Sequence, residues 1–290
     1  MTFRKARNSF LFLILFTLFL TSTVFAQKQV TGTWKAKFKA KHSDGIHISF
    51  YSDDSDGDHQ FGSSFKFERL QGLSVDQVKQ GSPVSFTIAS EAGNIDMNGT
   101  FTNGKGKGTF IFTPDANFSA SVENMGFKPI SSEKLFASAV LDVKLRTVSE
   151  LRNSGLKIDD YEDVFKATIF KVDADYISDM SQAGFENLDM EDLVKGRIFK
   201  IDAAYAREGI AMGFGGRSLE ELVKFRIFKV TPEFLSSMKA EGFTDLNAEQ
   251  VVQLRIFKIT PEFIQEMRAK GHTDASVEDL VQLKIRGKID

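Results

Sequence analysis

The sequence predicts an α+β protein in which a small antiparallel β sandwich or barrel is followed by an α-helical hairpin-repeat solenoid. Three observations lead to this prediction. The amino terminus has the pattern of an export signal, residues 30–113 alternate apolar and polar side chains, and a 29-residue repeat fills the rest of the chain. Alternation with a period of two is typical of half-buried strands, whereas repeats of this length are typical of stacked helix pairs.

Residues 1–26 are predicted to be a secretory signal peptide. A basic segment at Arg4–Arg7 precedes an apolar run, and Val24 and Ala26 occupy the small-residue positions of a cleavage site before Gln27. The apolar run of about eleven residues is shorter than the roughly 20 that span a bilayer, so cleavage is favoured over an uncleaved anchor helix. The mature chain is therefore expected to be periplasmic or secreted, with no stable membrane insertion.

The composition excludes several classes of function. The 290 residues include 37 Lys plus Arg, 39 Asp plus Glu, no Cys and 29 Phe, with a net charge of -2. Near-neutral charge gives no general attraction for nucleic acid or an anionic membrane. Without Cys there are no disulfides, thiolate zinc sites or Cys nucleophiles. The abundant Phe recurs with the repeat and is therefore interpreted as core.

Residues 27–110 are predicted to form the antiparallel β domain. Trp34, Ala36 and Phe38 alternate with lysines, and about six strands are expected between residues 30 and 113. The Asn103-Gly104 pair predicts a type I′ hairpin turn. Residues 74–79 are expected to form a short helical turn.

Residues 111–290 are predicted to form six αα repeats and a C-terminal tail. The string RIFK recurs at Arg197–Lys200, Arg226–Lys229 and Arg255–Lys258. The units are 111–139, 140–168, 169–197, 198–226, 227–255 and 256–284. A single pair of short helices cannot bury its apolar face, but stacked pairs share a continuous core.

The unit from residue 227 shows the predicted pattern of a repeat. Thr231 caps the first helix, Pro232 follows at its first position, and Gly242 ends it in the left-handed conformation. Asn247 and Gln250 form a capping box for the second helix. The same box is predicted for three other pairs, Asp189 with Asp192, Ser218 with Glu221 and Ser276 with Asp279. The apolar face of the second helix is assigned to Val251, Val252, Leu254 and Ile256.

Two irregular units interrupt this pattern. In the unit 140–168, Lys144 stands where other units carry a capping residue such as Asp173 or Thr231. In the unit 198–226, three glycines crowd the turn, and this loop is a possible contact site as well as a loosened turn. The three are Gly213, Gly215 and Gly216.

Basic side chains in register supply the candidate partner contacts. They are Arg197, Lys200, Arg226, Lys229, Arg255 and Lys258 in the repeats, and Lys35, Lys37 and Lys39 on the first strand. Such a ladder could hold an acidic partner or polyanion, but a parallel acidic column, Glu191, Glu220, Glu249 and Glu278, favours pairing within the chain. The strand lysines could contact an anionic envelope polymer, although lysines more often keep an edge strand soluble.

No catalytic signature occurs, because HExxH, GxSxG and P-loop motifs are all missing. Three histidines, His42, His47 and His59, could in principle hold a metal, and the loop with Asp53, Asp54, Asp56 and Asp58 could hold calcium loosely. Exposed polar residues are the favoured interpretation of both groups, since the loop lacks the first and last ligands of an EF-hand. We therefore predict no enzyme activity, cofactor or metal.

The segment RIFKVTPEFLSSMKAEGFTDLNAEQVVQLRIFKITPEFIQEMRAKGH resembles a repeat of exported bacterial proteins. Similar tandem units follow the membrane-embedded metallopeptidase domain of some BlaR-like antibiotic-sensor proteins. The resemblance covers about residues 111–290, and the preceding GTFTNGKGKGTFIFTP resembles the segment that often stands before those repeats. It implies an accessory sensing or interaction module. No protease activity follows from it, because the peptidase part does not occur here.

The expected function is that of an exported, non-enzymatic interaction protein that binds a protein or cell-envelope partner through its repeat surface. The alternative is a small-ligand carrier that uses the interior of the β domain. A hollow interior would favour the carrier, whereas an interior filled by Trp34, Phe38, Phe50 and Phe86 would count against it. A hydrolase with a dispersed site would need His and acidic side chains to converge in one cleft. Nucleic acid is not an expected partner, and the sequence leaves the oligomeric state open.

Overall fold

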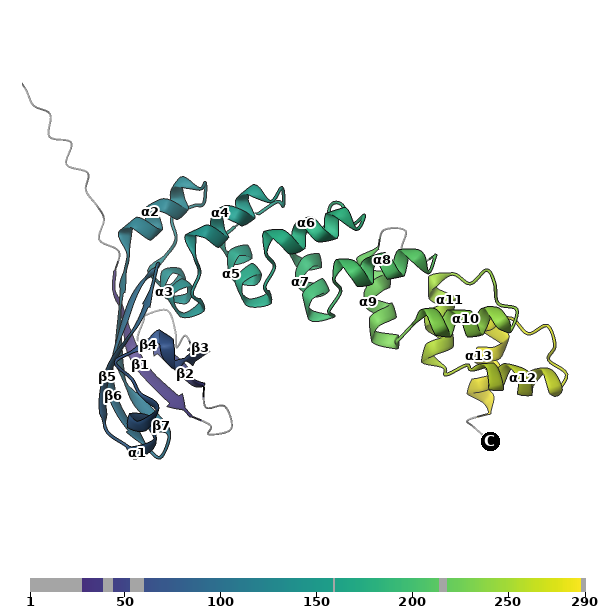
Figure 1. Cartoon of the computed structure of the whole chain (residues 1–290), viewed down its shortest axis with the longest axis horizontal. Coiled ribbons are helices and arrows are strands. Elements are labelled where there is room, and N and C mark those ends of the chain that lie inside the picture. The colour runs from purple at the N-terminus through teal and green to yellow at the C-terminus, as the bar shows by residue number, and fades with distance from the viewer. Residues whose placement is uncertain (1–27, 39–43, 53–59, 159, 214–217, 288–290) are drawn as a thin grey trace, which may run out of the picture.

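The computed structural model describes residues 28–38, 44–52, 60–158, 160–213 and 218–287, and its α+β architecture confirms the predicted fold class. Within these residues, a curled antiparallel sheet of seven strands is followed by helices in two rows (Figure 1). Several predictions fall outside the described residues: the signal peptide 1–26, Lys39, His42, His59, the aspartates of residues 53–58, Gly215 and Gly216.

The sheet is an open half-barrel. Its strands are β1 (Val30–Lys37), β2 (Gly45–Ser52), β3 (Gln60–Lys66), β4 (Leu70–Gln71), β5 (Pro83–Ser90), β6 (Gly93–Thr102) and β7 (Lys105–Pro114). The spatial order is β3-β2-β1-β7-β6-β5-β4, so β1 lies in the middle between β2 and β7. The interpretation of its lysines as edge-strand residues is therefore wrong. Strand order depends on which distant strands pair, and alternation within one strand carries no information about that pairing.

The local turns of the sheet follow the sequence. Asn103 and Gly104 both have positive φ, 49° and 74°, which is the type I′ geometry predicted for the β6–β7 hairpin. The predicted helical turn is α1 (Val75–Gln80), which starts with a capping box between Ser74 and Gln77. A short 3₁₀ segment, η1 (Phe67–Arg69), joins β3 to β4.

The repeats form six helix pairs in the described part of the chain. They are α2 (Ala116–Asn124) with α3 (Ser132–Leu141), α4 (Leu145–Asn153) with α5 (Tyr161–Phe170), α6 (Ala174–Gln182) with α7 (Met190–Ile198), α8 (Ala203–Ala211) with α9 (Leu219–Phe228), α10 (Pro232–Ala240) with α11 (Ala248–Ile256), and α12 (Pro261–Ala269) with α13 (Val277–Arg286). First helices form one row and second helices another (Figure 1). None of the helices described is long and apolar enough to cross a bilayer.

The helix ends confirm most of the predicted caps. Gly242 has φ 89°, and the Phe243 amide returns to the Met238 carbonyl at 3.1 Å, as in a left-handed C-cap. Reciprocal capping boxes occur at the start of α7, α11 and α13. The box predicted for Ser218 is wrong, because its side chain caps no amide. Its ψ of 112° differs from the 168° of Asn247, so the backbone at this position departs from that of the capped helix.

The interior of the half-barrel is filled by side chains. Phe136 of α3 lies against the sheet, stacked on Phe110 with ring centroids 5.0 Å apart and edge-on to Phe50 at 5.4 Å. Trp34 is fully buried, and its indole Nε1 donates to the carbonyls of Asn98 and Thr109 at 3.2 and 3.1 Å. Phe50 and Phe86 are also buried, while Phe38 is half-buried. This packing counts against a ligand-carrying interior.

The sheet and the first four helix pairs share one hydrophobic core. This core extends from Val30 to Val223, one smaller cluster joins the fourth and fifth pairs, and another lies within the last two pairs. The predicted boundary between residues 110 and 111 lies inside β7, and α3 of the first unit packs on five strands of the sheet. The β domain and the first four helix pairs therefore share one core.

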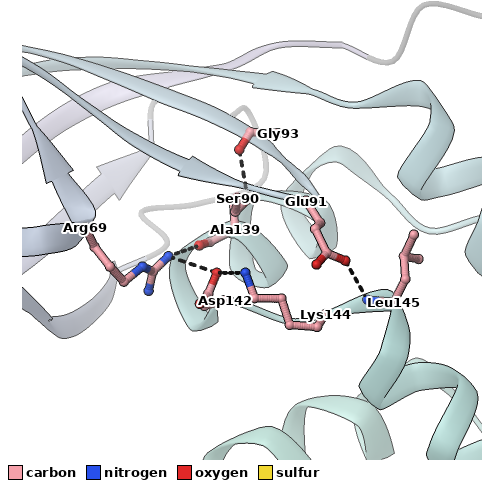
Figure 2. Close-up of polar contacts among 8 residues, drawn as sticks. All are labelled: Arg69, Ser90, Glu91, Gly93, Ala139, Asp142, Lys144 and Leu145. Carbon is pink, nitrogen blue, oxygen red and sulfur yellow. Dashed lines mark hydrogen bonds and ion pairs between the residues drawn. The ribbon is translucent and has the colours of Figure 1, made fainter.

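A hairpin of the sheet also completes the irregular second unit (Figure 2). The N-cap residue of α4, Lys144, makes no side-chain cap, and the Glu91 carboxylate between β5 and β6 accepts from the Leu145 amide at 2.8 Å instead. Lys144 turns to Asp142, with Nζ 2.8 Å from Oδ1. Arg69 reaches the same Asp142 at 3.4 Å. The capping residue missing from this repeat is therefore supplied by the sheet.

Candidate functional site

The arginines of the RIFK motif lie on the aromatic rings of the first helices. Arg226 stacks over Tyr205 at 3.6 Å from the ring centroid, and its Nη2 donates to the Lys200 carbonyl at 2.8 Å. Corresponding stacks join Arg197 to Tyr176, Arg255 to Phe234 and Lys284 to Phe263. A guanidinium over an aromatic face is stabilised by the ring quadrupole. These stacks therefore join the two helices of each of the last four pairs, so the three arginines are less available to a partner.

The lysines of the motif occupy strained backbone positions. Lys171, Lys200, Lys229 and Lys258 all have φ between 54° and 57°, the left-handed region. They end the second helices, and the next amide returns to the last turn, as Val230 does to the Phe225 carbonyl at 2.9 Å. Their side chains are exposed, and no ion pair involves them within the described parts of the chain.

The isoleucines of the motif face solvent. Ile169, Ile198, Ile227 and Ile256 are 46–53% exposed and recur in register along the row of second helices. We call these four side chains the isoleucine stripe. The assignment of Ile256 to the buried face is wrong, because Leu254 is buried and residues two apart on a helix point about 200° away from each other. The spacing of two residues between Leu254 and Ile256 was the signal in the sequence.

The stripe borders a groove. Between α9 and α11 a hollow of about 580 Å³ is lined by Phe228, Ile256, Lys224 and Glu249 among others. In the first pair, the position equivalent to Ile169 is Val140, which is buried in the core shared with the sheet. This repeat position is therefore buried in the first pair, whose second helix packs on the sheet, and exposed to solvent in the next four pairs.

The acidic column pairs with a different set of lysines from the one expected. Glu191 accepts from Lys166, and Glu220 accepts from Lys195 at 3.0 Å, each across neighbouring units. Charge pairing within the chain therefore exists, as predicted, but these two glutamates pair with lysines outside the RIFK motif. The motif itself contributes one ion pair, between Arg197 and Asp173 at 3.3 Å. These exposed ion pairs neutralise Glu191 and Glu220 on the second helices. They do not involve the RIFK lysines, which follow the isoleucines of the stripe in the sequence.

The described strand lysines lie on the outer face of the sheet. Lys35 and Lys37 are exposed on β1, and the Lys35 ammonium lies 4.9 Å from the centroid of the Tyr51 ring. Across the ladder they face two lysines that the sequence analysis did not single out, Lys107 and Lys105 of β7.

Metal and hydrolytic chemistry find no support in the described residues. No group of three His, Asp or Glu side chains there could hold a metal. His47 contacts the hydroxyl of Ser64 at 3.3 Å and lines a hollow of about 590 Å³ with Asp44, Lys37 and Lys66. This hollow brings together one histidine, one carboxylate and the Ser64 hydroxyl that contacts the histidine, and all three lie on an open, exposed part of the sheet.

Comparison with protein-family models, with curated proteins and with solved structures finds no match to the chain.

Proposed function

We propose that the chain is an exported, non-enzymatic interaction protein whose repeat surface binds a protein partner on the isoleucine stripe. The observation that carries the proposal is the stripe itself. Isolated exposed apolar residues are ordinary on protein surfaces, but a contiguous row is typical of an interaction site. Core packing does not require these isoleucines, since buried residues such as Leu222 and Leu254 already fill the interior of the second helices.

The chemistry beside the stripe indicates what the partner carries. The lysines of RIFK lie two residues after the exposed isoleucines, while Glu191 and Glu220 are engaged with Lys166 and Lys195. Glu249 lines the groove together with Lys224. Left-handed backbone costs a non-glycine residue about 1–2 kcal/mol, and glycine would occupy these positions without that cost. Lysine nevertheless occupies this position in four repeats, so its positive charge is inferred to serve binding. We therefore expect the partner to carry carboxylates beside its apolar side chains.

The spacing of the isoleucines also indicates which backbone conformation of the partner would fit the stripe. Packed helices lie about 8–10 Å apart, so successive isoleucines are expected at about this interval. A polyproline II segment rises about 3.1 Å per residue and returns to the same face every third residue, about 9 Å on. We therefore favour an extended segment with an apolar residue at every third position and acidic residues between them.

The carrier function is the weaker alternative. It requires space inside the β domain, whereas Trp34, Phe50, Phe110 and Phe136 fill the concave side of the sheet. The hollow beside His47 is open to solvent and has Lys37, Asp44 and Lys66 among its lining residues, which suits a fully enclosed apolar ligand poorly.

The test uses the full chain without its predicted signal peptide. Fluorescence anisotropy with a labelled peptide of Leu-Pro-Glu triplets should detect binding, and a Ser-Pro-Glu peptide should bind at least tenfold more weakly. The triple variant Ile198→Gln/Ile227→Gln/Ile256→Gln should lose at least tenfold in affinity, about 1.4 kcal/mol. Ile210→Gln is the matched control, because Ile210 is 44% exposed on α8, away from the stripe.

Capture from an envelope extract then identifies the natural partner, and the purified partner is titrated with both variants. Equal binding by the triple variant and the wild type would sink the assignment of the stripe. If neither peptide binds but the purified partner binds the wild type more tightly than the triple variant, only the polyproline II geometry would be rejected.

A further inference from the structure

The outer face of the sheet carries a compact group of four lysines on two neighbouring central strands. Lys35 is directly opposite Lys107, and Lys37 is directly opposite Lys105, in the antiparallel β1–β7 ladder. All four side chains are exposed. Opposed residues of an antiparallel pair have Cβ atoms about 4.5–5.5 Å apart, so the four stems emerge from a small area. We call this group the lysine rectangle.

No carboxylate of the described ladders lies opposite these lysines. On the β6 side, Thr100 faces Lys107 and Thr102 faces Lys105. On the β2 side, Ser49 faces Lys35, and His47 faces Lys37. The next pair along β1 and β7 consists of Thr33 and Thr109, which adds hydroxyl groups beside the rectangle.

Two acidic side chains of the described residues lie in this part of the sheet. Asp96 on β6 accepts from the Thr87 hydroxyl at 2.7 Å, and Asp44 lines the neighbouring hollow together with Lys37. No ion pair engages the four lysines in the parts of the chain that the structure describes. Like charges directly opposite on a ladder destabilise a sheet. The fold therefore tolerates two unfavourable pairs at its centre.

We propose that the lysine rectangle binds a multivalent phosphate-bearing polymer. Each phosphate of such a polymer offers strong acceptor oxygens and at least one negative charge, so it can accept hydrogen bonds from a pair of ammonium groups on opposed strands. A polymer places the next phosphate over the second pair. This site lies on the sheet, apart from the isoleucine stripe of the repeats, and does not depend on the function proposed for them.

The surroundings favour a soluble polymer over a protein or a membrane surface. Protein interfaces depend on several buried apolar or aromatic anchors, whereas the described outward residues beside the rectangle are threonine, serine and histidine with a single aromatic ring, that of Tyr51, whose centroid lies 4.9 Å from the Lys35 ammonium. Membrane-surface binding by a basic patch is strengthened by apolar side chains that insert into the lipid. Ile111 is the exposed apolar side chain of β7, and it lies four residues beyond Lys107 along the strand.

Isothermal titration of the full chain with short inorganic polyphosphate tests the site. We expect saturable binding that weakens steeply as salt rises, because bound counterions are released from the polyanion. The double variant Lys105→Thr/Lys107→Thr should lose roughly tenfold or more in affinity and show a shallower salt dependence. Its melting temperature should stay the same or rise, since threonine is a good strand former and the opposed charges are gone.

The control removes the same charge elsewhere. Lys128→Gln/Lys239→Gln changes two exposed lysines away from the sheet and should bind polyphosphate within about twofold of the wild type. The triple isoleucine variant should also bind it normally, which separates this site from the stripe. No saturable binding by the wild type, or an equal loss in the control, would overturn the proposal.

Two further probes identify the source of the phosphate. Vesicles containing phosphatidylglycerol that sediment with the wild type but not with the Lys105→Thr/Lys107→Thr variant would assign the phosphate to a lipid headgroup. Binding of polyphosphate with no vesicle binding would assign it to a soluble polymer. Polyglutamate that binds as tightly as polyphosphate would contradict a site for phosphate.

Discussion

The Glu91 carboxylate accepts a hydrogen bond from the Leu145 amide at 2.8 Å, 54 residues along the chain. Through this bond a hairpin of the sheet caps helix α4, whose own N-cap residue is Lys144. A carboxylate at a helix N-terminus both satisfies a free amide and interacts favourably with the helix dipole.

Replacement of this cap should therefore weaken the junction between sheet and repeats. Glu91→Gln is expected to lower the free energy of unfolding by about 1 kcal/mol, and Glu91→Ala by up to about 2 kcal/mol. Urea denaturation measures the change, with Glu68→Gln as a control at an exposed acid that pairs with the exposed Lys66. Equal stability of the Glu91 variants and the control would show that the bond contributes nothing.

The two kinds of left-handed residue should respond in opposite directions. A Cβ at Gly242 meets no atom within 4 Å, so Gly242→Ala isolates the cost of its φ of 89°, about 1–2 kcal/mol of destabilisation. Gly242→Val should cost more, since the branched side chain is less tolerant of this region. Lys229→Gly, at φ 54°, should stabilise by up to about 1 kcal/mol. Thermal unfolding of the three variants checks the signs, and a neutral Gly242→Ala would refute the cap assignment.

The absence of a side chain at Gly196 leaves room for the hydroxyl group of Tyr176. An added Cβ would overlap Tyr176 Oη, which donates to the Ile201 carbonyl at 2.8 Å. Gly196→Ala should therefore destabilise by about 1–3 kcal/mol through displacement of this hydrogen bond. In the double variant with Tyr176→Phe, the two costs should be less than additive, because both act on one hydroxyl. Additive costs in this double-mutant cycle, measured by urea denaturation, would contradict the coupling.

Two buried tyrosines should make the fold sensitive to alkali. Burial raises the pKa of Tyr161 to about 12, an effect partly offset by its hydrogen bond with Ser138, and burial likewise raises the pKa of Tyr176 to about 12. In the unfolded chain a tyrosine ionises near pH 10. The unfolded state therefore loses its protons first, and the free energy of unfolding should fall as pH rises from about 10 to 12.

Variants separate this effect from the titration of lysines. Tyr161→Phe and Tyr176→Phe should each reduce the slope of stability against pH in that window, and the double variant should reduce it further. Urea denaturation at several pH values measures the slope. A double variant with the wild-type slope would show that neither tyrosine is responsible.

Local signals predicted much of the fold, because they depend on neighbours in sequence. The period of 29 residues, the Asn103-Gly104 turn and the glycine that ends each first helix are of this kind. The position of α3 against the sheet was not predictable in this way. Phe136 occupies the same repeat position as Phe165, so its apolar character indicates burial without indicating the partner.

The candidate site was predicted in part. The motif RIFK was found, but only its basic residues were singled out, and the arginines turn out to stack on aromatic rings. The exposed isoleucine was hidden by its apolar character, although its spacing from Leu254 places it on the opposite face. Lys105 and Lys107 could not be joined to Lys35 and Lys37 without the pairing of β1 with β7.

The way α3 fills the half-barrel has a consequence for assembly of the chain. The concave side of the sheet has no complete core until α3 has been made, so residues up to Leu141 must all be available before the first stable unit can form. Each later helix pair can then pack on the folded pair that precedes it. A chain that emerges amino terminus first can therefore build the array in one direction, with the sheet and α3 as the template. Fraying should begin at the other end, at α13.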